Sequence, residues 1–194
     1  QMGDGADPTL AYDANGNILT YRRNGHLAAT PVMDSLNYTY NAATNQLNRV
    51  QDLAPSNTAY ADDIDDNQQA NNYTYDAIGN LITDSSENIR ATAGGIKWNV
   101  YGKITEINKV DSSAGNPYNK GRVKKITYSY DAGGNRISKK VERYTNALVD
   151  YTWYVRDASG NVMSTYTYTS TTATDLLANN LMQSEVYLFG SSRL

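Results

Sequence analysis

One phrase decides the fold, and its last full copy reads Tyr130-Asp131-Ala132-Gly133-Gly134-Asn135-Arg136-Ile137-Ser138. Two earlier copies read Tyr12-Asp13-Ala14-Asn15-Gly16-Asn17-Ile18-Leu19-Thr20 and Tyr75-Asp76-Ala77-Ile78-Gly79-Asn80-Leu81-Ile82-Thr83. A phrase that returns at such intervals is the signature of a repeat protein, in which each unit packs mainly against its neighbours. We therefore predict a repeat array before considering any local structure.

Three degenerate copies complete the pattern: Tyr40-Asn41-Ala42-Ala43-Thr44-Asn45-Gln46-Leu47, Trp98-Asn99-Val100-Tyr101-Gly102-Lys103-Ile104 and Asp157-Ala158-Ser159-Gly160-Asn161-Val162, the last with its aromatic residue at Tyr154. With the Asp or Asn as marker, the copies stand at residues 13, 41, 76, 99, 131 and 157. We predict one continuous array over residues 1–194. Polar, Gly, Ser and Pro residues indicate loop insertions at about 51–72 and 111–121, and Thr174–Gln183 is a candidate short helix.

Each copy is typical of a β-hairpin. The approach to the marker alternates, as in Tyr38-Thr39-Tyr40, so the tyrosines fall on one face of a strand. The Asp side chain can accept backbone N–H groups two residues on and nucleate the turn, while the Gly three residues later suits a left-handed position beside a bulge. We predict structural turn roles, and no catalytic carboxylates, for Tyr12, Asp13, Gly16, Tyr75, Asp76, Gly79, Tyr130, Asp131, Gly134, Asp157 and Gly160.

Composition excludes several classes of protein. The 194 residues contain no Cys, one His and 17 Tyr against one Phe, with a formal charge of −3. Disulfide frameworks, thiol catalysis and Cys-based zinc sites are excluded. A nucleic-acid binder is disfavoured because such domains are usually basic, and no apolar run reaches the roughly 20 residues of a membrane span. Because Gln1 precedes Met2 and strand-like sequence continues to the end, we expect an excerpt of a longer chain.

Other candidate sites are weak. His26 has no His or Cys partner. Asp63, Asp65 and Asn67 alternate like the start of a calcium loop, but Gln68 and Thr74 occupy the Gly and Glu positions of an EF-hand. A solvated acidic loop is the default, with an irregular calcium site as the alternative. A basic cluster fits either a charged edge strand or an anion site, and it comprises Lys120, Arg122, Lys124 and Lys125.

The repeated phrase resembles the YD repeat of RHS-repeat proteins. The stretches Trp153–Met163 and Glu185–Leu194 resemble late repeats of the bacterial members, so the likeness spans essentially the whole chain. It implies a long β-sheet strip that spirals into a hollow shell. In toxin complexes the shell encloses a C-terminal effector, and in teneurins a similar barrel serves adhesion. Many members of this family end in a core that cleaves itself at an Asp-Pro-x-Gly-type signature and releases the effector. Here Asp7-Pro8 is the one Asp-Pro pair, and it lies at the wrong end without the glycine pattern. No cleavage activity is therefore assigned.

We therefore expect an all-β, non-enzymatic segment that builds the wall of a secreted or surface-exposed bacterial RHS protein. Its expected partners are the rest of the same polypeptide and an enclosed C-terminal effector, with no nucleic acid, no membrane span and no cofactor. One alternative is an adhesion module in which Tyr38 and Tyr73 stack on surface glycans, although the same tyrosines would also pack the array. A second alternative is self-assembly into an extracellular fibre through open strand edges.

Overall fold

The structure is a computed structural model, and it describes residues 11–29, 31–54, 60, 64, 68–111, 123–144, 148–170, 181–188 and 192–193. Among these residues, the named elements are antiparallel β-strands and the short 3₁₀ helix η3 (Ala91–Ala93). The all-β prediction is therefore confirmed. The chain divides into two compact units, Gln1–Glu87 and Asn88–Leu194.

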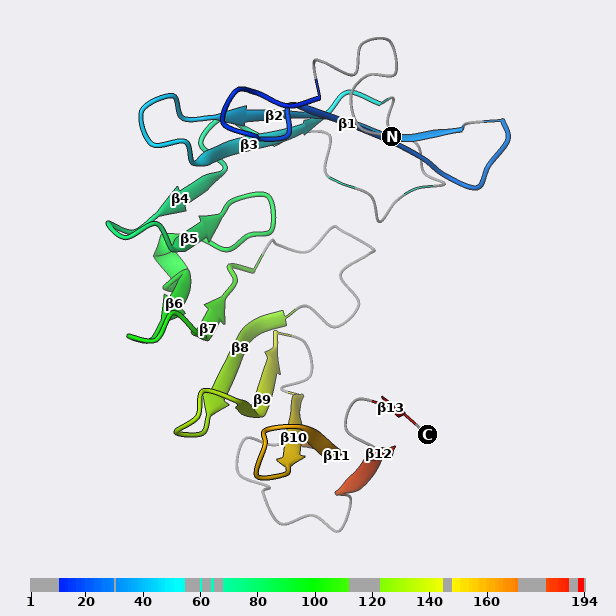
Figure 1. Cartoon of the computed structure of the whole chain (residues 1–194), viewed down its shortest axis with the longest axis vertical. Coiled ribbons are helices and arrows are strands. Elements are labelled where there is room, and N and C mark those ends of the chain that lie inside the picture. Colours follow the sequence, from blue (N-terminus) through cyan, green and yellow to red (C-terminus); the bar gives the residue numbers. More distant parts are fainter. Residues whose placement is uncertain are drawn as a thin grey trace. The chain divides into compact units, whose positions relative to one another are not determined.

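The first unit contains two sheets (Figure 1). A bridge between Tyr12 and Ile18 closes the first hairpin. The larger sheet has the order β1-β2-β3, and the other pairs β4 with β5. The strands are β1 (Thr20–Asn24), β2 (Val32–Tyr40), β3 (Leu47–Asp52), β4 (Tyr73–Tyr75) and β5 (Leu81–Asp84).

The second unit is built on one open eight-stranded sheet, in which each strand pairs with its sequence neighbours and β6 and β13 form the edges. The succession from β6 to β12 is visible in Figure 1. The strands are β6 (Ile96–Trp98), β7 (Ile104–Asn108), β8 (Val123–Tyr130), β9 (Arg136–Arg143), β10 (Val149–Arg156), β11 (Val162–Ser170), β12 (Met182–Leu188) and β13 (Ser192–Arg193).

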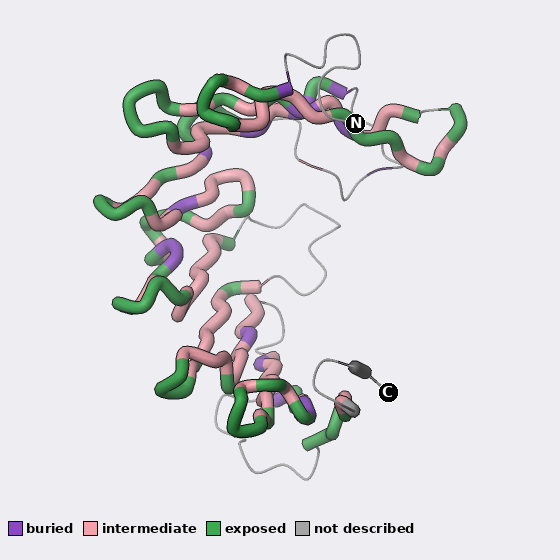
Figure 2. Tube along the Cα trace, in the orientation of Figure 1, coloured by how far each residue is buried: buried purple, intermediate pink, exposed green. Residues whose placement is uncertain are grey.

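Strand register gives this sheet two different faces. Direct cross-strand partners lie on one face, and one such row runs Ile96, Ile107, Ile126 and Val141. The adjacent row on the opposite face runs Lys97, Glu106, Thr127 and Lys140. Figure 2 shows that most strand residues are half-buried and that fully buried positions are scattered. Cross-strand pairs rather than a deep core therefore hold the sheet.

Two sequence expectations need correction. The helix considered at Thr174–Gln183 is wrong at its end, because Met182 and Gln183 belong to β12 and pair with Thr167 and Tyr166 of β11. As a strand, Met182 and Gln183 can pair with the backbone N–H and C=O groups at the edge of β11, which a helix would leave unpaired. Residues 174–180 lie outside the described part of the chain. The insertion predicted at 51–72 begins later than expected, since Gln51 and Asp52 complete β3. Of the insertion predicted at 111–121, only Asp111 is described.

Candidate functional site

The first repeat turn is closed by the side chain of Asp13. One carboxylate oxygen, Oδ1, accepts the backbone N–H groups of Asn15 at 2.9 Å and Asn17 at 2.8 Å. The other, Oδ2, accepts the Asn17 side-chain amide at 2.8 Å. The Gly16 N–H donates to the Asp13 carbonyl at 3.0 Å, and Gly16 has a φ of 84°, which suits a residue without a Cβ. Asp13 thus serves as the turn's internal acceptor.

Four later turns repeat this geometry around Asp76, Asn99, Asp131 and Asp157. In each, a Gly three residues after the marker has positive φ, and these are Gly79 (93°), Gly102 (69°), Gly134 (78°) and Gly160 (87°). The hairpin register shifts beside each turn, as expected for a bulge. The turn after Asn41 is one residue longer and places Asn45, with φ 58°, in the left-handed position.

Hydrogen bonding lowers the pKa of all four turn aspartates. The side-chain amide of Asn17 is the main cause for the pKa of Asp13, and Asn161 acts in the same way on the pKa of Asp157. The backbone N–H of Asn135 is the main cause for Asp131. At Asp76 burial raises the pKa, but the donors from Asn80, Ile78 and Gly79 together outweigh it. The hydrogen bonds of the folded turns therefore favour the ionised carboxylate over the protonated carboxyl group.

These shifts predict acid sensitivity. A carboxyl group whose pKa is lower in the folded than in the unfolded state stabilises the protein above its unfolded value of about 3.9, and this contribution is lost as the pH falls through the folded value. Changing all four aspartates to Asn should keep the turns, as at Asn99, but should lower the unfolding free energy at pH 7, because the contribution of the ionised carboxylates is lost. The loss of unfolding free energy between pH 5 and pH 3, measured with urea, should shrink. If the quadruple variant loses as much unfolding free energy between pH 5 and pH 3 as the unchanged protein does, the prediction is contradicted. The four aspartates to be changed are Asp13, Asp76, Asp131 and Asp157.

In three of the repeats, the tyrosine before the marker bonds to the hairpin before it. The Tyr40 hydroxyl donates to the Ile18 carbonyl at 2.9 Å, and the Tyr75 hydroxyl donates to the Leu47 carbonyl at 2.9 Å. In the second unit the Tyr130 hydroxyl reaches the Ile104 carbonyl at 2.6 Å. Each acceptor is the residue across the hairpin from the preceding repeat's own aromatic position. We call this contact the inter-repeat bond.

Arg156 makes the same bond without an aromatic ring. Its Nε donates to the Arg136 carbonyl at 3.0 Å, and its Nη1 donates to the Gly160 carbonyl at 2.6 Å. Arg136 lies opposite Tyr130, as Ile104 lies opposite Trp98. The sequence interpretation gave Tyr154 this place, but Tyr154 stands three residues before its marker, like Tyr128 before Asp131. Counting back from the marker would have identified Arg156.

Removing one such bond tests its contribution. Tyr130→Phe should lower the unfolding free energy by about 1 kcal/mol, the usual net worth of a hydrogen bond. Tyr101→Phe is the control, since that ring is 82% exposed and its hydroxyl bonds to no described residue. Urea unfolding followed by the fluorescence of Trp98 and Trp153, both in the second unit, measures the loss. Equal stability of the two variants would sink the assignment.

Adjacent turns also contact each other. The side-chain amide of Asn17 donates to Asn45 Oδ1 at 2.6 Å, and that of Asn15 donates to the same oxygen at 3.2 Å. In the second unit, a Cβ built on Gly160 would lie 3.0 Å from the side chain of Asn135. The turns are therefore stacked by their own polar side chains.

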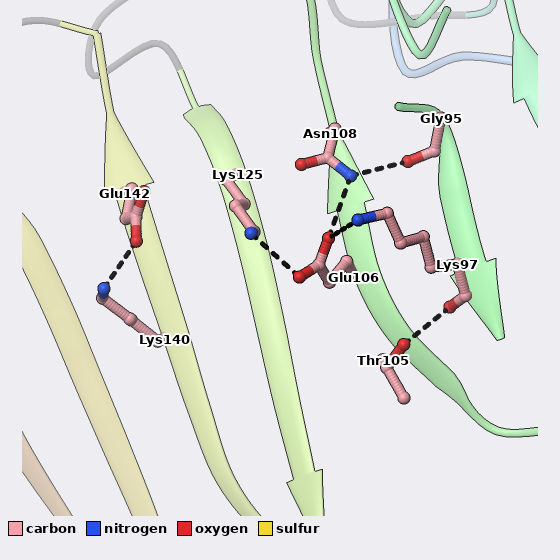
Figure 3. A network of polar contacts seen from close by, with 8 residues as sticks. All are labelled: Gly95, Lys97, Thr105, Glu106, Asn108, Lys125, Lys140 and Glu142. Carbon is pink, nitrogen blue, oxygen red and sulfur yellow. Dashed lines mark hydrogen bonds and ion pairs between the residues drawn. The ribbon is translucent and has the colours of Figure 1, made fainter. Parts of the chain in front are cut away.

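Ion pairs bridge the polar face of the second unit (Figure 3). Glu106 receives Lys97 Nζ at 2.7 Å and Lys125 Nζ at 2.9 Å, so it ties β6, β7 and β8 together. The Lys97 and Lys125 ammonium groups lower the pKa of Glu106 to about 2. Because β8 lies between β7 and β9, the charged-edge interpretation of this strand is wrong. Of the basic cluster, Lys124 lies over the Tyr144 ring, and Lys120 and Arg122 lie outside the described residues.

The remaining sequence candidates form no joint site among the described residues. Tyr38 and Tyr73 are half-buried, burial raises the pKa of both, and the Tyr73 hydroxyl accepts from Gln68 Nε2 at 3.4 Å. His26 contacts Tyr60 edge to face. The calcium candidates lie outside the described residues. Among the described residues, no three metal-ligating side chains form a cluster. These candidates are Asp63, Asp65 and Asn67.

Neither a known family nor a curated protein matches this chain. Over the part of the chain that the structure describes, no helix has the length and apolar character needed to cross a membrane.

Proposed function

We propose that this chain is a structural repeat segment of an RHS-type protein, forming part of a wall that encloses an effector or of an extended surface assembly. The observation that carries the proposal is the inter-repeat bond. It recurs from Tyr40, Tyr75 and Tyr130, and from Arg156 with a different side chain. The same bond to the preceding hairpin is made by a tyrosine hydroxyl in three repeats and by an arginine guanidinium in another. This recurrence with different side chains favours a role in joining successive hairpins.

The chemistry of the repeats supports the same role. The turn carboxylates are taken up by internal hydrogen bonds, which leaves them poor candidates for acid–base chemistry. Half-buried sheet faces with alternating tyrosines suit a wall that contacts further protein on one side. We accordingly propose a non-enzymatic segment of a secreted or cell-surface bacterial protein.

The test is the intact denatured mass of the native protein, with peptide mapping past both ends. Enclosure predicts a chain far heavier than 21.4 kDa that continues beyond Leu194. The C-terminal part should resist protease until the shell is opened, and electron microscopy should show hollow particles. A native chain ending near Gln1 and Leu194 would contradict enclosure, because six repeats cannot close a shell. Fibre assembly or adhesion would then be the better account.

A further inference from the structure

The sequence contains two Asn-Gly pairs, Asn15-Gly16 and Asn24-Gly25, and both lie in the first unit. Such a pair can lose the Asn side-chain amide without an enzyme, because the backbone nitrogen of the Gly can attack the Asn Cγ. Gly favours this ring closure, since it has no Cβ and its backbone is permissive. Both Asn residues are exposed, so exposure alone does not distinguish the two pairs. The contacts around each pair do.

The first pair lies in the turn of a short hairpin. Asn15-Gly16 follows the marker Asp13, and the arms of the hairpin meet at a bridge between Tyr12 and Ile18. A Cβ built on Gly16 would meet nothing within 4 Å, so no neighbouring group packs against this glycine. Segments with few contacts and exposed backbone open at low free energy. We therefore expect this turn to open locally while the sheet beside it stays folded.

Two hydrogen bonds restrain the first pair in the closed turn. The Gly16 N–H donates to the Asp13 carbonyl at 3.0 Å, and the Asn15 side-chain amide donates to Asn45 Oδ1 at 3.2 Å. The attack needs a free Gly16 nitrogen and a free Asn15 side chain, so it proceeds from the opened turn. Asn15 and Gly16 are both exposed, so water can replace each of these partners when the turn opens.

The second pair is held by the sheet and by a buried ring. Asn24 pairs with Val32 at the end of the β1–β2 ladder, and the Gly25 N–H donates to the Pro31 carbonyl at 2.9 Å. Gly25 also lies against the ring of Tyr60, which is 6% exposed, since a Cβ there would stand 2.3 Å from ring atoms. Moving Gly25 off this ring would expose apolar surface to water. The opening that the attack requires is therefore rarer at Asn24 than at Asn15.

We propose that Asn15 is a site of spontaneous deamidation and that the fold protects Asn24. The Gly16 nitrogen bonds to Asn15 Cγ, and the bond from Cγ to the side-chain nitrogen breaks. That nitrogen leaves as ammonia with the proton of the Gly16 N–H, and a succinimide ring remains. Water then opens the ring at either carbonyl, which leaves aspartate or isoaspartate at position 15. Water replaces ammonia overall, and no oxidant or other co-reactant is needed.

Either product weakens the contact between the first two turns. The amide that donates to Asn45 Oδ1 becomes a carboxylate, which repels that oxygen. The new charge also lies close to Asp13, whose Oδ1 accepts the Asn15 N–H. Isoaspartate in addition lengthens the backbone of the turn. The modification therefore loosens the first repeat from the second, and this inference is independent of the proposed function.

Peptide mapping by mass spectrometry on the full 194-residue chain tests the proposal. The chain is incubated in mildly alkaline buffer, both folded and in guanidinium chloride, and aspartate and isoaspartate are quantified at each site. In the folded chain we expect deamidation at Asn15 to be at least tenfold faster than at Asn24. In the unfolded chain the two rates should be similar, because both residues precede Gly. Equal rates in the folded chain, or an Asn15 that reacts only in the unfolded chain, would overturn the proposal.

Two variants test the reason for the difference. Tyr60→Leu removes the ring against which Gly25 lies, and it should speed deamidation at Asn24 at least fivefold while the rate at Asn15 is unchanged. Tyr60→Phe is the matched control, since it keeps the ring and should leave Asn24 protected. If Asn24 reacts equally slowly in both variants, the Tyr60 ring does not protect it, and this account of the second pair is wrong.

Discussion

Replacing Arg23 with Met should destabilise the first unit by about 3 kcal/mol, the lower end of the cost of breaking a buried ion pair. Asp34, at the centre of β2, is 0% exposed, and its carboxylate receives Arg23 through Nε and, at 3.1 Å, through Nη2. Removing the guanidinium leaves a buried charge without its main partner. Because the Arg23 side chain is 45% exposed, water compensates in part and the upper end of the range is not reached.

A double-mutant cycle separates the pair from ordinary loss of packing. Arg23→Met combined with Asp34→Leu should recover most of the lost stability, because replacing both partners removes the unpaired charge. Arg49→Met is the control, since Arg49 of β3 forms no ion pair among the described residues. Hydrogen exchange of the β2 amides reports the stability of this unit. A double variant as unstable as Arg23→Met would show that the charge is not the cause.

The repeat turns are predictable from sequence because each one is a local device. A marker side chain bonds to groups two and four residues away, and a Gly takes a backbone angle that other residues avoid. No distant residue has to be placed first. This is why the positions of Asp13, Gly16 and their equivalents in the structure can be read directly from the repeated phrase.

The long-range contacts are not predictable in this way. The Arg23–Asp34 pair and the Arg156–Arg136 bond depend on strand register across β1–β2 and across β8–β9–β10. Its place before the marker Asp157 singles out Arg156, but its bond to the Arg136 carbonyl follows only from the register of β9 and β10. Likewise, the turns after Asn99 and Asp131 stand far apart in the sequence, yet Tyr101 of one and Gly133 of the other line the same groove.

Gly160→Val should destabilise the second unit by about 2–3 kcal/mol, because two costs combine. At φ 87° a Cβ adds left-handed strain of about 1–2 kcal/mol. That Cβ would also lie 3.0 Å from Asn135 Oδ1 and 3.2 Å from its Nδ2. Asn135 cannot yield freely, since its amide donates to both carboxylate oxygens of Asp131. Moving it would loosen the neighbouring turn.

Gly102→Val isolates the backbone part of this cost. Gly102 lies in the same unit with φ 69°, and a Cβ there would meet nothing within 4 Å. Its substitution should therefore cost about 1–2 kcal/mol from left-handed strain alone. Urea unfolding followed by tryptophan fluorescence compares the two variants. The excess cost of Gly160→Val measures how strongly one repeat turn rests on the next, and equal costs would mean that stacked turns contribute nothing to joining the repeats.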